Sequence, residues 1–102
     1  MASRLGEAEI AEAVERLDGW AYDGDDRAIS RKFIFDDFDE AMSFILEVAD
    51  IAREMDHHPE LFNVYNEVAL SMTTHDAGGV TARDVAFAER VEALFEEGEE
   101  TP

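Results

Sequence analysis

The order of apolar and polar residues along the chain predicts three helices. The first covers residues 7–17, where apolar side chains recur every three or four positions, and Gly19 follows as its candidate C-terminal cap. The second begins at Asp37, which can form a capping box with Glu40, and carries an apolar stripe to about Glu54. Both helices are therefore expected to bury one face against other elements.

The third helix has a similar start. Thr81 is its expected N-cap and Asp84 lies at the third helical position, so the two residues can form a capping box. Val80 and Val85 can pack against each other across this start as a hydrophobic staple. The inner face of this helix continues at Val91, Leu94 and Phe95.

Alternation of apolar and polar residues predicts strands. Four segments are expected: residues 20–22, 28–35, 61–65 and 68–74. In the second strand, Arg31 is the exception on an otherwise apolar side. In the fourth, Val68, Leu70 and Met72 face one side of the sheet. Asn66 is the expected turn between the last two strands.

These elements follow in the order α-β-β-α-β-β-α. Strands joined by short turns pair antiparallel, and the helices between the pairs cover one face. The sequence therefore predicts an α+β fold, a four-stranded antiparallel sheet with three helices on one face, in a single domain over residues 1–102 with an ordered core of about 5–96. Since the other face is less protected, we expect a homodimer or homotetramer.

The net charge of the chain limits the kinds of partner that it can be expected to bind. Of 102 residues, 26 are acidic and 8 are basic, which gives a formal net charge of −18. Nucleic acids and anionic membranes attract positive surfaces, so neither is expected as a partner. The acidic residues are spread along the chain and Lys32 is its single lysine, a composition that suggests adaptation to high salt.

Other absences in the sequence bear on location and chemistry. The chain has no cysteine, which excludes disulfides, thiolate zinc ligands and cysteine nucleophiles. No apolar run approaches the ~18–20 residues that cross a bilayer. The first residues carry no secretory pattern, so a cytoplasmic location is expected.

All three histidines lie in one segment of the chain. His57 and His58 are adjacent, and His75 follows the expected fourth strand. Histidine exchanges protons near neutral pH because its unperturbed pKa is ~6.5. If the last helix returns over this edge of the sheet, Asp84 lies near the imidazoles. The four side chains would then form a general acid/base site without a cofactor.

Each of these residues also has a structural explanation. Adjacent histidines are commonly surface or helix-end residues, a histidine at a strand end can bond to the backbone, and Asp84 can serve only as a cap. A three-histidine zinc site is conceivable because imidazole binds zinc. Adjacent histidines seldom reach one ion, however, and no metal site is predicted.

The residue types and their separations carry more information together than singly. The segment contains Asp56-His57-His58-Pro59-Glu60, Asn63-Val64-Tyr65-Asn66, Thr74-His75-Asp76, Gly79 and Asp84. Upstream lie Gly19-Trp20, Phe33-Ile34-Phe35, Asp37-Phe38, Ala41 and Phe44. From about residue 5 to residue 94, the chain resembles the pterin-4a-carbinolamine dehydratase family. The fold of that family agrees with the order of elements predicted above.

The resemblance implies a reaction. The family's enzyme, 4a-hydroxytetrahydrobiopterin dehydratase, is a lyase that eliminates water from 4a-hydroxy-tetrahydropterin to give quinonoid dihydropterin. An acid must protonate the departing hydroxyl group, and a base must take the proton from N5. The pterin is the substrate, and the resemblance implies no metal or other cofactor.

The resemblance also implies roles for individual residues. His57, His58 and His75 are the implied pterin-site histidines, with His57 and His75 as acid and base in either order and His58 assisting. The implied supporting or binding residues are Asp84, which can orient an imidazole, Pro59, which fixes the His-His segment, and Thr74, near main-chain groups that can bond the pterin ring.

The chain departs from the family pattern at two positions, and other functions stay open. Arg53 stands where an acidic or other polar residue is usual, and Leu61 stands where an aromatic residue is common. One alternative function is a non-catalytic oligomeric interaction or regulatory module. Another is a related pterin-processing activity with the same pocket chemistry. The three intact histidines favour the dehydratase over a pure scaffold.

The high-salt hypothesis predicts that KCl stabilises the fold. Thermal unfolding in low and in molar KCl should show a higher melting temperature in molar KCl, because salt screens the repulsion among surplus carboxylates. An unchanged or lower melting temperature would mean that the acidic surface serves only solubility.

Overall fold

The chain folds in the predicted order of elements. The computed structural model describes residues 3–100, and within them are three α-helices, four strands and one short 3-10 helix. In chain order these are α1 (Glu7–Arg16), β1 (Ala21–Asp23), β2 (Ala28–Ile34), α2 (Phe38–Met55), β3 (Glu60–Val64), β4 (Glu67–Met72), η1 (His75–Ala77) and α3 (Ala82–Glu100). The α-β-β-α-β-β-α order is confirmed, and η1 is an addition between β4 and α3.

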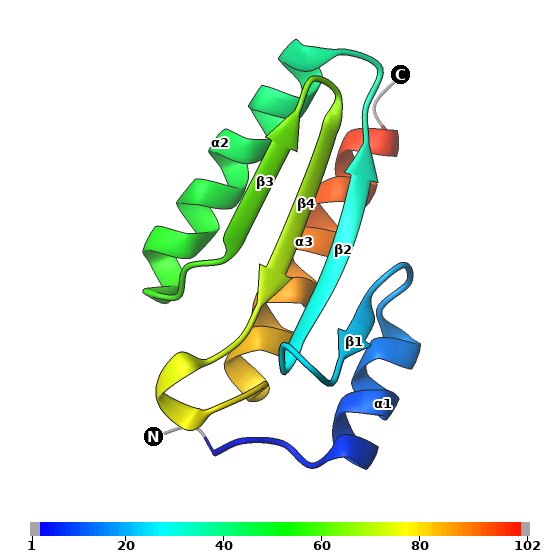
Figure 1. The fold of residues 1–102 in the computed structure, drawn as a ribbon. Coiled ribbons are helices and arrows are strands. Elements are labelled where there is room, and N and C mark those ends of the chain that lie inside the picture. Colours follow the sequence, from blue (N-terminus) through cyan, green and yellow to red (C-terminus); the bar gives the residue numbers. More distant parts are fainter. Residues whose placement is uncertain (1–2, 101–102) are drawn as a thin grey trace.

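The four strands form one antiparallel sheet in the order β1-β2-β4-β3 (Figure 1). The central pair is β2 with β4, in which Phe33 lies opposite Val68 and Ile29 lies opposite Met72. The other neighbour of β4 is β3, with Leu61 opposite Leu70. The three apolar residues of β4 that were predicted to share a face are all fully buried. The α+β class and the sheet pattern are thus confirmed.

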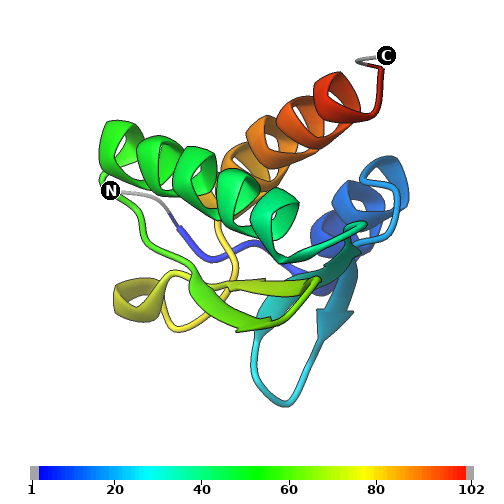
Figure 2. The same ribbon diagram turned by 90° about the horizontal axis from the view of Figure 1, so that it is seen from above.

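The helices cover one face of this sheet. Figure 2 shows α2 and α3 side by side above the strands, with α1 near β1 on the same side. The core lies between the layers. Its largest fully buried side chains are Phe33, Phe87, Ile10, Ile29, Leu70, Met72, Val48, Val68, Val80 and Val91. On the open face of the sheet, Phe62, Val64 and Ile34 stay exposed.

The ends of α2 follow the sequence signals. Asp37 is the N-cap, and its Oδ1 accepts a hydrogen bond of 2.9 Å from the main-chain N of Glu40. At the other end, Asp56 takes the left-handed conformation with φ 49°. The main-chain N of His57 then donates to the carbonyl of Ala52 at 3.1 Å, closing the helix before Pro59.

The structure corrects the predicted end of α1. Leu17 is the C-cap, and Gly19 lies in the turn beyond it with φ 86°. A Cβ atom at Gly19 would stand 2.7 Å from Nε of Arg31, so this position needs glycine for its backbone and for its neighbour. Strand limits also shift slightly: β1 is Ala21–Asp23, and Tyr65 lies in the β3–β4 turn with φ 48°.

Arg31, the charged exception in β2, belongs to a buried polar cluster under α3. Its Nη1 donates to Oε1 of Glu92, and the same carboxylate oxygen accepts a bond of 2.7 Å from Nε1 of Trp20. The guanidinium lies 4.5 Å from the ring centre of Phe33 and 4.9 Å from that of Phe95. A charged residue can therefore occupy an inward-facing position of β2 because an acid on α3 balances its charge.

This cluster gives a stability prediction. Replacing Glu92 by Ala should lower the free energy of unfolding by about 3–5 kcal/mol, because it leaves the largely buried guanidinium of Arg31 without its counter-charge and the indole N–H of Trp20 without its acceptor. The matched control is Glu89→Ala on the same helix, whose exposed pair with Arg16 is worth about 0–1 kcal/mol. Urea unfolding of both variants measures the difference, and equal losses would contradict the role of the cluster.

Candidate active site

The candidate site forms where the end of α2, the end of β4 and the start of α3 meet. His57 leaves α2, Thr74 follows β4, and Thr81 precedes the first turn of α3. Thr81 is an N-cap as predicted, since its Oγ1 accepts from the main-chain N of Arg83 at 3.2 Å and its own N donates to Oδ2 of Asp84 at 2.8 Å. The cap of α3 therefore points Asp84 toward the end of α2.

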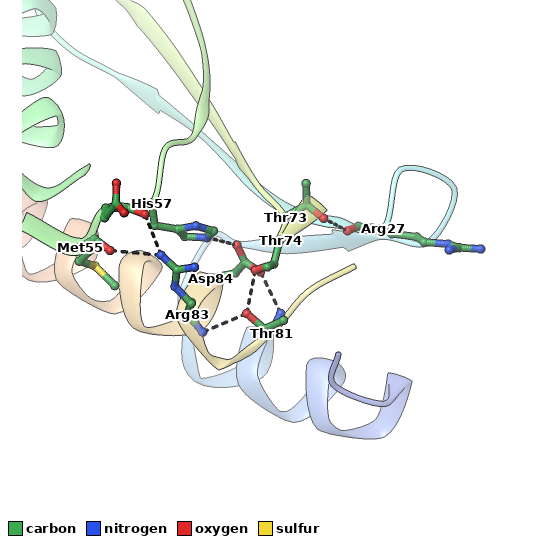
Figure 3. Close-up of polar contacts among 9 residues, drawn as sticks. Arg27, Met55, His57, Thr73, Thr74, Thr81, Arg83 and Asp84 are labelled. Atoms are coloured by element: carbon green, nitrogen blue, oxygen red, sulfur yellow. Dashed lines mark hydrogen bonds and ion pairs between the residues drawn. The ribbon is translucent and has the colours of Figure 1, made fainter. Parts of the chain in front are cut away.

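Asp84 is completely buried and joins the three segments (Figure 3). Its Oδ1 lies 2.6 Å from Nε2 of His57. Its Oδ2 accepts from Oγ1 of Thr74 at 2.8 Å and from the main chain of Thr81. The hydroxyl groups of the two threonines are 2.7 Å apart. The sequence prediction that Asp84 both caps the helix and reaches a histidine is thus observed.

The bonds to Asp84 decide which nitrogen of His57 is free. A carboxylate is an acceptor, so Nε2 of a neutral His57 carries the proton and donates it. The other ring nitrogen, Nδ1, then holds a lone pair. Among the described residues, every fully buried side-chain nitrogen and oxygen has a hydrogen-bond partner. Nδ1 has no hydrogen-bond partner among these residues, so it is not fully buried.

His58 and Pro59 continue directly from His57 toward β3. The side chain of His58 is exposed and Pro59 is half-buried. The exposed side chain of His58 thus follows the buried side chain of His57 directly in the chain. The two side chains therefore have different environments.

His75 lies in η1 rather than at the end of a strand, because β4 already ends at Met72. Its side chain is exposed, and it follows Thr74 directly. The main-chain N and O of Thr74 both bond to Gly79, at 3.0 and 3.3 Å, which closes the loop that carries His75. Thr74 thus uses its main chain within the loop and its side chain on Asp84.

Hydrogen bonds therefore link only part of the predicted set. His57 and Thr74 are each hydrogen-bonded to Asp84, whereas His58 and His75 are exposed and adjacent in sequence to these residues. Sequence reasoning gave Thr81 only a capping role and gave Arg83 none. The signal for both was their position beside Asp84 at the start of the same helix.

The described residues offer neither a cluster of metal ligands nor a membrane-spanning helix. In the part of the chain that it describes, no group of three or more histidine, cysteine or acidic side chains could hold a metal ion. No helix among those residues is long and apolar enough to cross a bilayer.

A separate hollow of about 650 Å³ lies at the other end of α2. Phe35, Phe44 and Phe95 form part of its lining, with acidic side chains around them. None of the predicted site residues lines it, so it does not belong to the His57 site.

Comparison with known proteins assigns the chain to a family. Residues 3–94 match the sequence model of a family described as pterin 4 alpha carbinolamine dehydratase. The chain belongs to this family. A relative from Rhizorhabdus wittichii, which carries a provisional name as a pterin-4-alpha-carbinolamine dehydratase, is 51% identical over 92 residues, covering 90% of this chain and 95% of the relative. A similarly named protein of Thermomicrobium roseum is 44% identical, covering 90% of this chain and 97% of its own.

Two solved structures of proteins described as pterin dehydratases or as pterin dehydratase-like are similar to this chain. A protein of Brucella melitensis described as a transcriptional coactivator/pterin dehydratase superposes with a TM-score of 0.87 at 42% identity, covering 90% of this chain and 98% of its own. A pterin dehydratase-like protein described as a RuBisCO assembly factor in the alpha-carboxysome has a TM-score of 0.64 at 23% identity, covering 74% of this chain and 88% of its own. The second comparison shows a shared fold alone.

The buried carboxylate gives a second stability prediction. Replacing Asp84 by Asn should lower the free energy of unfolding by about 1–3 kcal/mol, because an amide cannot accept all three donors that now point at the carboxylate. Asp76→Asn, a change to an exposed acid of η1, is the matched control. Urea unfolding should separate the two variants, and a neutral Asp84→Asn change would contradict the bonding described.

Proposed function

We propose that the protein eliminates water from a 4a-hydroxy-tetrahydropterin to give quinonoid dihydropterin, by histidine general acid/base catalysis. Family membership supports pterin carbinolamine dehydratase activity. The observation that supports the histidine mechanism is the bond between His57 and the buried Asp84, because in a neutral imidazole it leaves Nδ1 as the nitrogen that can accept a proton.

The proposed reaction moves one proton from N5 of the pterin and one to its departing hydroxyl group. Nδ1 of His57 takes the proton from N5 of the pterin, and the electron pair of that N–H bond forms the C4a–N5 double bond. The C4a–O bond breaks as His75 or His58 protonates the hydroxyl group, which leaves as water. A proton then passes from His57 to the acid, directly or through solvent, and restores both groups. Acid/base groups in such positions typically contribute ~10²–10⁴-fold to a rate.

The positions of His58 and His75 support the proposal that one of them is the acid that protonates the hydroxyl group. His58 and His75 are exposed and directly follow residues that are hydrogen-bonded or fixed at the site, so solvent can resupply their protons. Asp84 and Thr74 do not contact substrate in this proposal. They hold the ring of His57 and fix which of its nitrogens carries the proton.

A stopped-flow assay of 4a-hydroxy-tetrahydropterin decay tests the proposed reaction. In high salt, the wild type should accelerate decay above the spontaneous rate, and His57→Ala and His75→Ala should each lose about 10²-fold or more of that acceleration. No acceleration by the wild type would refute the dehydratase. Equal rates in all three proteins would instead refute the residue assignment. Melting curves of the variants control for loss of the fold.

We further propose that the protein is at least a homodimer that forms through the edge of β3. In the sheet order, β3 is an edge strand, and it presents exposed Leu61, Phe62 and Val64, with exposed fractions of 42%, 63% and 50%. Apolar edge strands readily pair with another chain. The likeness to the Brucella melitensis protein described as a transcriptional coactivator/pterin dehydratase makes an interaction role the second candidate function, and this surface is the feature that would serve it.

The proposed dimer predicts a change in mass on substitution. Sedimentation in molar salt should show particles larger than the 11.4 kDa chain, and Phe62→Lys with Val64→Lys should shift them toward that mass. Leu46→Lys, an exposed apolar position on α2, should leave at least a dimer. Wild-type particles of about one chain mass would overturn the proposal.

A further inference from the structure

We propose that Arg83 is a positioning residue that fixes the main chain ahead of His57, and this inference rests on the proposed function. Its Nη2 donates to the carbonyl of Asp56 at 2.7 Å and to that of Met55 at 3.2 Å (Figure 3). These two carbonyls immediately precede His57. Arg83 therefore holds the segment from which the catalytic imidazole extends.

The end of a helix needs such a partner. The last carbonyl groups of a helix receive no hydrogen bond from an N–H group of the same helix. They also carry the negative end of the helix dipole. Met55 and Asp56 stand at this end of α2. The positive guanidinium of Arg83 donates to both of their carbonyl oxygens and offsets the negative end of the dipole. The same guanidinium bonds to the carbonyl of Asp56, whose main chain is in the left-handed conformation.

Adjacent residues of α3 thereby hold adjacent residues of the site. Arg83 binds the main chain at Met55 and Asp56, and Asp84 binds the ring of His57. With the main-chain bond of His57 to Ala52, the imidazole is fixed from three directions. Loss of Arg83 leaves the ring tethered through Asp84 but releases the backbone that sets where Nδ1 points.

Arg90 offers a matched control on the same helix. Its Nη2 bonds to Oε1 of Glu54 at 2.9 Å, so it also links α3 to the last turns of α2. That link joins two side chains and involves no carbonyl ahead of His57. Removing Arg90 therefore loses an α2–α3 contact of comparable kind without releasing the site segment.

Kinetics of Arg83→Met, Arg83→Lys and Arg90→Met test the proposal. Arg83→Met should lower kcat by about 10- to 100-fold, the loss typical of a small displacement of a reacting group, with a much smaller change in KM. Arg83→Lys should recover part of kcat because an ammonium group can reach one carbonyl. Arg90→Met should keep kcat. Equal kcat values for Arg83→Met and Arg90→Met would overturn the proposal.

A spectroscopic measurement separates this proposal from the dehydratase itself. In protein labelled with ¹⁵N-histidine, the ring signals of His57 should shift or broaden in Arg83→Met and stay unchanged in Arg90→Met, whether or not the wild type shows dehydratase activity. Unchanged His57 signals in folded Arg83→Met would refute the positioning role. Urea unfolding of each variant confirms that folded proteins are being compared.

Discussion

The buried carboxylate of Asp84 is the interaction on which the arrangement of the site depends. A fully buried carboxylate is costly unless hydrogen bonds replace the water it has lost. Here the donors come from three separate segments: His57 after α2, Thr74 after β4, and Thr81 before α3. Because no one segment supplies them all, the carboxylate is satisfied only when the three segments have met. The fold and the orientation of the imidazole are therefore set by the same bonds.

The long helix α3 is tied to the sheet layer at two polar points. Asp84 in its first turn binds the loop after β4, and Glu92 further along accepts from Arg31 of β2 and from Trp20. Buried ion pairs are weak evidence for stability. If α3 packed in a shifted register, however, these charges would lose their partners, which costs free energy. With apolar side chains such as Phe87, Ala88 and Val91 between them, the two points specify how α3 lies on the core.

Local signals in the sequence were enough for much of this structure. Periodicity gave the helices and strands, and the pairs Asp37 with Glu40 and Thr81 with Asp84 marked helix starts because capping is a matter of neighbouring residues. Features that depend on distant partners could not be found this way. The cluster around Glu92, the η1 turn that carries His75, and the two carbonyls bound by Arg83 all depend on where separate segments come together. The mistaken cap at Gly19 has the same origin, since its conformation makes room for Arg31 of a different element.

We propose that Asp84 presents Nδ1 of His57 to a pterin as a proton acceptor. Titration of ¹⁵N-histidine-labelled protein with a stable dihydropterin, followed by NMR at neutral pH, tests it most directly. If this proposal holds, Nε2 is protonated and stays bonded to Asp84 throughout, and Nδ1 is unprotonated and its signal moves as the pterin binds. A proton on Nδ1 of neutral His57, or binding that leaves both of its ring signals unchanged, would contradict it.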